Sequence, residues 1–333
     1  MPEMLLLRSL SDPAANNNGL HGSFLAKWGR ENCILWGRAR HAEFGPHIHS
    51  LSIRAVWGGA QYCQVDRRTV SIDDDNFLVL NHGRICSTSI RAAQPVEALT
   101  ICFQPGLVGQ VQRDTAGSVE EALDRGGFSM EGCADFIENL QPHEGRVSPV
   151  LRFIRAHLRR GLVDEAWYEE QLVFLLGRMC GRQAWLLQQI DQLAFIRPAT
   201  RREIYRRVGL ATDFLHTHYA QDVDLGTLAR TAYLSKFHFL RLFTLIHAVT
   251  PRIYLQRKRV GVAVRLLEST PLTVSEVAAS VGFTNASTLL RQMRLRTQLS
   301  PRQIRARVRS GDAARRADPR HSQLQPAEIA IVA

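Results

Sequence analysis

Between residues 33 and 104 the chain alternates short apolar and polar runs, which are separated by clusters of turn residues. Runs such as SLSIRAVW, AQYCQVD and NFLVL are typical of strands with one buried face, and DDDN and NHG are typical of turns. Six or seven short strands spaced in this way predict a small barrel or sandwich. We therefore expect the front of the chain to consist mainly of β-structure.

From about residue 118 the apolar residues recur at helical spacing instead. The segment SVEEALDR begins with a capping-box pattern, in which Ser118 is followed three residues later by Glu121. Three amphipathic helices are expected next, at 147–160, 165–179 and 182–195. One face of the first carries Val150, Phe153, Ile154 and Leu158. These helices are expected either to pack against the strands or to pair with a second subunit.

Charge is distributed unevenly along the chain, whose formal net charge is +11. Residues 201–310 contain 19 Lys and Arg against six Asp and Glu, whereas residues 1–200 contain 20 against 22. Such an excess of positive charge favours a polyanionic partner, most simply nucleic acid. Codon usage explains the preference for Arg over Lys, but it does not explain why acidic residues become scarce after residue 200.

The six cysteines lie at positions 33, 63, 86, 102, 133 and 180, and no two form a C-x-x-C pair. A chain of this kind without a recognisable secretory leader is expected to be reduced and cytosolic. No apolar run approaches the ~18 residues that a membrane-spanning helix needs. We find no phosphate-binding loop, nucleophile elbow or pair of catalytic carboxylates, and we therefore expect no enzyme activity.

Two stretches of the basic segment resemble each other at an offset of 49 to 50 residues. The first, LARTAYLSKFHFLRLF, begins at Leu228, and the second, VAASVGFTNASTLLRQM, begins at Val277. Each predicts a short helix, a turn and a second helix, which is a helix-turn-helix. The predicted core consists of Ala229, Phe239 and Phe243 in the first unit, and Ala278, Gly282, Leu289 and Met293 in the second.

Local signals support both units. Small Ala residues allow the two helices to cross closely, and Gly282 adopts a left-handed turn at low cost. Ser235 is expected to cap one second helix, and Thr284 or Asn285 the other; Thr273 and Glu276 form a capping box. Residues 251–270 predict one continuous helix between the units, with Val260, Ala263, Leu266 and Leu267 on its buried side. If this helix holds the two recognition helices ~34 Å apart, they can enter successive major grooves.

These motifs resemble the DNA-binding domain of the AraC/XylS family of bacterial transcription regulators. The resemblance covers residues 208–309 and is carried by LARTAYLSKFHFLRLFTLIHAVTPRIYLQRKRVGVAVRLL and SEVAASVGFTNASTLLRQMRLRTQLSPRQIR. It implies an α+β chain with an N-terminal cupin-like β-barrel, a helical dimerisation segment and a C-terminal all-α domain with two helix-turn-helix motifs. The expected bounds are 1–30 for a flexible lead-in, 31–117 for the barrel, 118–200 for the helical region, 201–309 for the DNA-binding domain and 310–333 for a disordered tail.

The sequence departs from the family pattern in two ways. Three positions where the family usually has Gly are occupied by Tyr233, Ala248 and Gln298. A side chain in a left-handed turn costs ~1 kcal/mol or more, so these turns either adopt other geometries or reduce stability. Family aromatics in the second unit are replaced by Leu289, Met293 and Thr297, which predicts a thinner core and a firmer first unit.

The resemblance also implies which residues touch DNA. Arg241 and Arg291 occupy positions that reach base edges in the family, and Arg binds guanine through a forked pair of hydrogen bonds. The base-contact candidates are Phe237, Leu240, Arg241, Ser287, Thr288, Leu290 and Arg291. The phosphate-contact candidates are Lys236, Arg257, Arg259, Arg294 and Arg296. The alternatives are packing against a neighbouring helix for Phe237 and Leu240, and solvated surface charge for any single Arg.

Histidines in the front domain raise the question of a metal. His47 and His49 lie on one face of a predicted strand, and His82 is the only plausible third ligand. The carboxylate that a metal-binding cupin carries a few residues later is absent, so ordinary histidines are the alternative. We expect no metal and no cofactor.

Three hypotheses therefore remain open. The first is an effector-responsive transcription regulator, usually an activator, whose partners are double-stranded promoter DNA, RNA polymerase, a small-molecule effector and a second copy of the chain. The second is a cupin-type metalloenzyme with an accessory DNA-binding domain. The third is a thiol redox-sensing regulator, although cysteines in predicted strands, such as Cys63, Cys86 and Cys102, are expected to be buried and inert.

Overall fold

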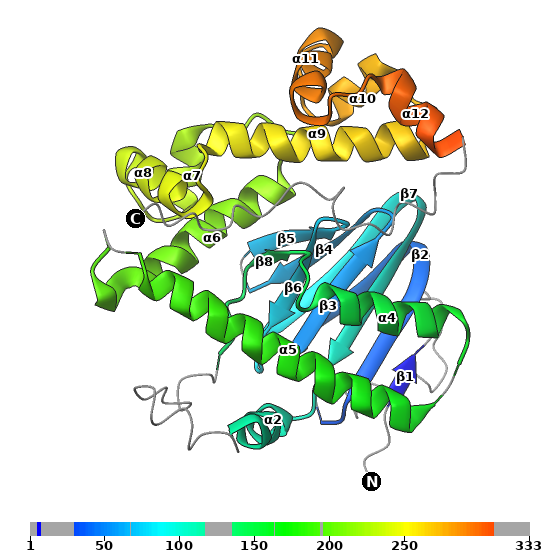
Figure 1. Cartoon of the computed structure of the whole chain (residues 1–333), viewed down its shortest axis with the longest axis vertical. Helices are drawn as coiled ribbons and strands as arrows, with labels where there is room; N and C mark the ends of the chain where they lie inside the picture. The colour runs from blue at the N-terminus through cyan, green and yellow to red at the C-terminus, as the bar shows by residue number, and fades with distance from the viewer. Residues whose placement is uncertain are drawn as a thin grey trace. The chain divides into compact units, whose positions relative to one another are not determined.

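The computed structural model describes residues 5–7, 30–66, 68–116, 135–162, 164–193 and 196–309. The chain divides into two compact units, Met1–Ala194 and Phe195–Ala333 (Figure 1). The predicted capping box at Ser118 and Glu121, Cys133, most of the lead-in and the tail 310–333 lie outside the described residues. The domain bounds expected from the sequence stay predictions.

The described part of the first unit is built on a sheet of eight strands. They are β1 (Leu5–Leu7), β2 (Cys33–Ile48), β3 (Ser52–Trp57), β4 (Ala60–Val65), β5 (Arg68–Asp73), β6 (Asn76–Leu80), β7 (Ile85–Cys102) and β8 (Leu140–Pro142). The pairing order is β1-β2-β7-β3-β6-β8, and β4 pairs with both β5 and β7. Only the β1–β2 pair among these is parallel.

Strand β7 makes this sheet into a nearly closed antiparallel barrel. It is 18 residues long and pairs with β2 through two register shifts. Its first part also pairs with β4 and its last part with β3, so one strand belongs to two neighbouring groups of strands. The sheet must bend to accommodate both groups, and register shifts allow such bending. The barrel expected from the sequence is confirmed.

Alternation along the strands separates two hydrophobic cores. Val56, Cys63, Leu78 and Ile90 belong to the core inside the barrel. Ile53, Phe77, Leu99 and Ile101 point to the opposite face and form a second core with the helices. These helices are α2 (Leu107–Ala116), α4 (Ser148–Arg159) and α5 (Glu165–Asp191), and Figure 1 shows α4 and α5 lying across the sheet.

The helical segment differs from expectation in two respects. The helices predicted at 165–179 and 182–195 are one continuous helix, α5, because no proline interrupts it and buried residues on both sides of Gly181 offset the ~1 kcal/mol that a helical glycine costs. Phe153, expected on the buried face of α4, is 56% exposed and contacts Trp167 at 5.4 Å between ring centroids.

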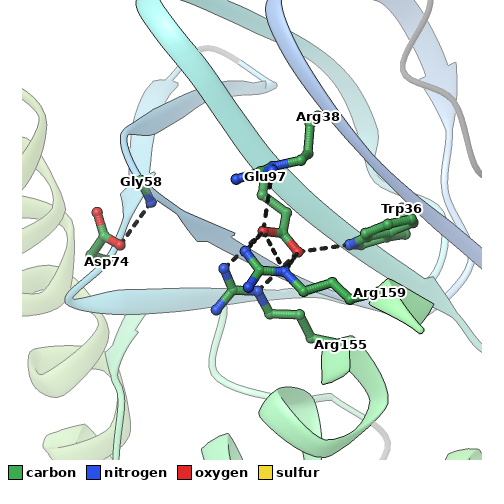
Figure 2. Close-up of polar contacts among 7 residues, drawn as sticks. All are labelled: Trp36, Arg38, Gly58, Asp74, Glu97, Arg155 and Arg159. Carbon is green, nitrogen blue, oxygen red and sulfur yellow. Dashed lines mark hydrogen bonds and ion pairs between the residues drawn. The ribbon is translucent and has the colours of Figure 1, made fainter. Parts of the chain in front are cut away.

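A buried carboxylate fastens α4 to the sheet. Glu97 of β7 is 1% exposed; its carboxylate accepts hydrogen bonds from Arg155 at 2.9 and 2.8 Å, from Arg159, and from Trp36 Nε1 at 3.0 Å (Figure 2). Burial raises the pKa of this carboxyl, but the bonds from Arg155, Arg159 and Trp36 outweigh it and lower the pKa to about 2. Glu97 is therefore ionised, and two helical arginines are fixed to the barrel.

The second unit is helical throughout its described residues. A 3₁₀ turn, η2 (Pro198–Thr200), precedes α6 (Arg201–Thr217), α7 (Leu225–Thr231), α8 (Lys236–His247), α9 (Pro251–Ser269), α10 (Val274–Ser280), α11 (Ala286–Thr297) and α12 (Pro301–Arg309). Helix α9 runs through the middle of this unit, with α7 and α8 at one end and α10, α11 and α12 at the other (Figure 1). The two helix-turn-helix units expected from the sequence are confirmed.

Candidate nucleic-acid interface

The first helix-turn-helix unit consists of α7, a short turn and α8. Asp224 begins α7, and its side chain accepts hydrogen bonds from the backbone N–H groups of Gly226 and Thr227. Ser235 begins α8 and accepts from the N–H of His238. These bonds satisfy N–H groups that lack partners within a helix, so the chain fixes both helix starts locally. The predicted core residues Ala229, Phe239 and Phe243 are all buried.

Aromatic rings fill the core of this first unit. Phe239 and Phe243 lie 5.5 Å apart between ring centroids, and Phe243 contacts the rings of His247 at 4.3 Å and Tyr254 at 5.5 Å. Thr212 Oγ1 donates to the carbonyl of Val208 and lies 3.0 Å from His247 Nε2, which therefore donates to it. Burial, with a smaller effect of His216, lowers the pKa of His247 to about 3, so this imidazole is neutral at pH 7.

The second unit consists of α10, a turn and α11. Thr273 and Glu276 form the predicted capping box, with N–H to side-chain distances of 2.7 and 3.2 Å. Of the two residues considered for the cap of α11, Asn285 fills the position and accepts from the N–H of Thr288 at 2.8 Å. Ala278, Leu289 and Met293 are buried with mainly aliphatic neighbours.

Both turns have the same backbone geometry. Tyr233 has φ of 54° and Gly282 has φ of 83°, which places both in the left-handed region. The N–H of Leu234 donates to the carbonyl of Ala229 at 2.9 Å, and the N–H of Phe283 donates to that of Ala278 at 2.9 Å. Ala248 and Gln298, at the ends of α8 and α11, are also left-handed, with φ of 55° and 56°. The three non-glycine sites thus keep the left-handed geometry instead of adopting another.

Gly282 is required by its surroundings as well as by its backbone angle. A Cβ atom there would overlap the carbonyl oxygen of Ala220 and would lie 2.8 Å from the carbonyl carbon. Ala220 belongs to the loop between α6 and α7, so the turn of the second unit packs directly against a loop that leads into the first. Tyr233, at the matching position, is 74% exposed and meets no such neighbour.

Helix α9 begins with a Thr250 cap followed by Pro251, and it holds the two units together. Val260, Ala263 and Leu267 are buried as expected, whereas Leu266 is only partly buried. Arg259 donates to the carbonyl oxygens of Tyr219, Gln221 and Gly282, each at 2.7 Å. Its guanidinium therefore joins α9 to both the α6–α7 loop and the second turn.

The recognition helices expose most of the base-contact candidates. Lys236, Phe237, Leu240 and Arg241 of α8, and Ser287, Leu290 and Arg291 of α11, are exposed; Phe237 is 81% exposed. Thr288 is half-buried, and its hydroxyl donates to Asn285 Oδ1 at 2.9 Å. Within the described part of the chain, no hydrogen bond or ion pair holds the guanidinium of Arg241 or Arg291. Both side chains are thus available to a ligand.

The phosphate-contact candidates separate into two kinds. Lys236 and Arg294 are exposed, Arg257 is half-buried, and Arg296 donates to Gln292 Oε1 at 3.4 Å. Arg259 differs because the carbonyl oxygens of Tyr219, Gln221 and Gly282 occupy its donors, which leaves it an internal structural role. The sequence did not reveal this role, because no local pattern marks the three carbonyls. Tyr233, which was considered only as a turn residue, is 74% exposed and adds an aromatic side chain to the surface just before α8.

The metal candidates of the barrel are not arranged as a metal site. His49 is buried and bonded to the guanidinium of Arg54, with 2.9 Å between His49 Nε2 and Arg54 Nη2. His47 lies 4.1 Å from His49 between ring centroids, whereas His82 is exposed. Among the described residues, no group of three or more His, Cys, Asp or Glu is placed to hold a metal ion. Arg54 supplies a positive charge where a cation would need ligands.

Comparison with known proteins agrees with the presence of both helix-turn-helix units. A family profile described as "Helix-turn-helix domain" matches residues 228–307. The HTH-type transcriptional regulator Rv1931c of Mycobacterium tuberculosis is 40% identical over 81 residues, which cover 24% of this chain and 31% of that protein. The MmsAB operon regulatory protein of Pseudomonas aeruginosa is 31% identical over 125 residues, which cover 36% of this chain and 39% of that protein. Each match spans well under two thirds of the relative's length.

A solved structure is also similar to part of this chain. It is the DNA-binding domain of AdpA, solved in complex with a target DNA. The match is 32% identical, covers 31% of this chain and 94% of the AdpA chain, and has a TM-score of 0.29. None of the described helices is both long enough and apolar enough to span a membrane.

Proposed function

We propose that the C-terminal part of this chain, which matches a helix-turn-helix domain over residues 228–307, is of the AraC type and that the protein is a sequence-specific DNA-binding transcription regulator. In this proposal α8 and α11 enter successive major grooves on one side of promoter DNA. The observation that supports it most directly is the pair of capped helices on one spacer, each with an exposed, unpaired arginine at the matching position.

The chemistry of the two helices suggests a division of roles. Arg241 and Arg291 would bind guanine O6 and N7, and each such pair is worth ~1–3 kcal/mol of discrimination between bases. Phe237 and Leu240 would contact thymine methyl groups. Lys236, Arg257, Arg294 and Arg296 would contact phosphates, which adds affinity and salt dependence with little sequence selectivity. Ser287 and Leu290 complete the proposed α11 face.

The wider partners belong to the same proposal. The regulator would act in the bacterial cytoplasm as an activator that contacts RNA polymerase. Its barrel would respond to an effector, and the helical segment of the first unit would pair with a second copy. The metalloenzyme alternative has no comparable support, because the guanidinium of Arg54 bonds to His49, one of the histidines that would start a metal site.

The test begins with genome-wide mapping of the sites bound by the full chain, which supplies an operator. Arg241→Ala is expected to lower the ratio of operator affinity to random-DNA affinity by roughly 5- to 150-fold, which corresponds to ~1–3 kcal/mol. The slope of log affinity against log salt concentration should change by about one at most, which corresponds to one phosphate contact. Fluorescence anisotropy with operator and random duplexes at several salt concentrations measures both quantities.

Two matched variants complete this experiment. Arg202→Ala removes an exposed arginine outside residues 228–307 and should leave the affinity ratio unchanged. Lys236→Ala should weaken binding to both duplexes alike and lower the salt slope by about one. An Arg241→Ala protein that is folded and keeps the wild-type affinity ratio would contradict the proposed base contact. A wild-type chain with no preference for any mapped site would contradict the proposed function.

A further inference from the structure

Four cysteines and one arginine meet inside the N-terminal barrel. Cys33, Cys63, Cys86 and Cys102 are each at most 1% exposed, and all carry free thiols. Cys33 lies opposite Cys102 in the β2–β7 register. Cys63 lies diagonal to Cys86, because Val65 of β4 is the residue opposite Cys86. Arg54 of β3 is 3% exposed and contacts this group.

The charge of Arg54 has no carboxylate to balance it within the described part of the chain. Its Nη2 atom bonds to the ring of His49 at 2.9 Å, and its Nε has no hydrogen-bond partner. Burial and the positive charge of Arg54 both lower the pKa of His49, so this imidazole stays neutral and cannot compensate. An uncompensated buried charge is costly. Among the described residues, the groups able to become negative beside Arg54 are the four thiols, of which Cys63, Cys86 and Cys102 act most on its pKa.

The thiols of Cys63 and Cys86 differ in acidity. The hydrogen bond from Cys63 lowers the pKa of Cys86 to about 7, with a further contribution from Arg54 that opposes the effect of burial. The same contact, together with burial, raises the pKa of Cys63. As a thiol, Cys86 Sγ donates to the carbonyl of Ser87 at 3.4 Å, and as a thiolate it accepts a hydrogen bond from Cys63 instead. The lowered pKa makes the Cys86 thiolate more accessible near neutral pH than that of an ordinary cysteine.

We propose that Cys63 and Cys86 form a redox-sensitive dithiol inside the barrel, which a hydroperoxide converts to a disulfide. The Cys86 thiolate attacks the terminal oxygen of the hydroperoxide; an S–O bond forms, the O–O bond breaks, and the departing alkoxide or hydroxide takes a proton. Cys63 sulfur then attacks the Cys86 sulfenic acid. The S–S bond forms, the S–O bond breaks, and water leaves with the Cys63 proton.

The position of Cys86 near a strand end gives a small hydroperoxide a short route to its thiol. Cys86 is the second residue of β7, next to Ile85, which is 51% exposed, and the turn residues 82–84 before it are exposed. A small hydroperoxide therefore needs only an opening of the strand end. Such openings are low-energy fluctuations compared with global unfolding.

The register gives this reaction a structural consequence. Diagonal neighbours on antiparallel strands have Cα atoms ~7–8 Å apart, whereas a relaxed disulfide prefers ~4.4–6.8 Å. Closing the bond therefore pulls β4 along β7, and β7 also pairs with β2 and β3. An effect of this shift on DNA binding rests on the proposed function; the thiol chemistry does not.

The experiment uses the full chain, reduced and then treated with hydrogen peroxide at pH 7. Free thiols are blocked with iodoacetamide, and tryptic peptides are analysed by mass spectrometry, since arginines separate Cys63 from Cys86. A Cys63–Cys86 linked peptide should appear in the wild type and in Cys33→Ser, the matched control. It should be absent from Cys86→Ser. Cys63→Ser should stop at a sulfenic acid on Cys86, which dimedone traps.

A second measurement needs no variant. The rate of Cys86 alkylation in the wild type should have a midpoint near pH 7, at least one unit below that of Cys33. The charged or titratable groups that face Cys86 from the packed elements are Cys63, Arg54, Asp66 and His47, and His49 bonds to Arg54 behind them.

Several results would overturn the proposal. They are preferential oxidation of Cys33, Cys102 or Cys180, a Cys86 midpoint above about pH 8.5, or no linked peptide in folded wild-type protein. All these readouts are made without DNA. A chain that lacks operator preference but forms the bond would therefore refute only the proposed function, and the reverse outcome would refute only the redox proposal.

Discussion

The two helix-turn-helix units share a backbone plan but stabilise it differently. In the first, the rings of Phe239, Phe243 and Tyr254 fill the core, and an exposed Tyr233 occupies the left-handed turn. In the second, the core is mainly aliphatic and the turn is a glycine packed tightly against the Ala220 backbone. The first unit therefore depends on ring packing that includes Tyr254 of α9, whereas the second depends on contacts with a neighbouring loop.

This difference has a practical consequence for experiments. All five tryptophans, Trp28, Trp36, Trp57, Trp167 and Trp185, precede residue 195. Tryptophan fluorescence therefore reports on the first compact unit alone. Hydrogen exchange with peptide resolution distinguishes α8 from α11 within the other. The comparison can thus be tested in the full chain.

The largest effect is expected for Gly282→Ala. The substitution places a side chain at φ of 83° and forces it against the Ala220 carbonyl, so we expect a loss of about 3 kcal/mol in the second unit. Amide protection of α10 and α11 should fall by roughly 100-fold, while tryptophan fluorescence stays unchanged.

Tyr233→Ala is the matched control for that substitution. It keeps a Cβ atom at the equivalent left-handed position, which is exposed, so protection of α7 and α8 should change little. Equal losses in the two variants would mean that the turns are equivalent and that the Ala220 contact does not distinguish them.

The next largest effect is expected on acidification, which should destabilise the first helix-turn-helix unit more than the second. The pKa of His247 is about 3 in the folded chain, below the ~6.5 of an unfolded histidine. A depressed pKa favours the neutral form, so this stabilisation is complete above about pH 6.5 and is lost as pH falls towards 3. Between pH 7 and pH 4 the loss is about 3 kcal/mol. No histidine occurs between residues 248 and 309, so the second unit lacks this effect.

Hydrogen exchange at pH 7 and pH 4, corrected for intrinsic rates, measures the acid effect. Protection of α8 should fall by roughly 100-fold while that of α11 is retained, and His247→Leu should remove the difference. Parallel losses in α8 and α11 would show that His247 does not control the acid response.

The smallest effect concerns the ends of the recognition helices. Ala248 and Gln298 both have φ near 55°, and a glycine there relieves left-handed strain. We expect Ala248→Gly and Gln298→Gly each to stabilise its own unit by about 0.5–1 kcal/mol, measured by urea denaturation followed by circular dichroism. Ala279→Gly, inside α10, should instead destabilise by about 1 kcal/mol. Opposite signs at the two helix ends would contradict the strain argument.

Local chemistry explains which parts of the fold could be predicted. Ser235, Thr250 and the Thr273–Glu276 box each satisfy helix N–H groups within four residues, so the sequence alone locates these helix starts. The strands follow from alternation over a few residues. The continuity of α5 through Gly181 was missed because tertiary packing, and not local preference, decides whether a glycine ends a helix.

The proposed contact surface was predictable to the same extent. Exposure of Arg241 and Arg291 follows from helical periodicity and from the repeat. The internal role of Arg259 could not be foreseen, because its three acceptors come from segments 23 to 40 residues away. For the same reason the pairing of Cys63 with Cys86 depends on strand register, which no single run of residues encodes.

The three hydrogen bonds from Arg259 to backbone carbonyls help to fix the distance between the two helix-turn-helix units. This one guanidinium ties α9 to the loop that leads into α7 and to the turn of the second helix-turn-helix unit, so it resists changes in the spacing of the two units. An operator that binds both recognition helices must therefore keep a constant number of base pairs between its two half-sites. One extra base pair between them would turn the distant half-site by about 35° around the duplex axis, away from the helix meant to read it.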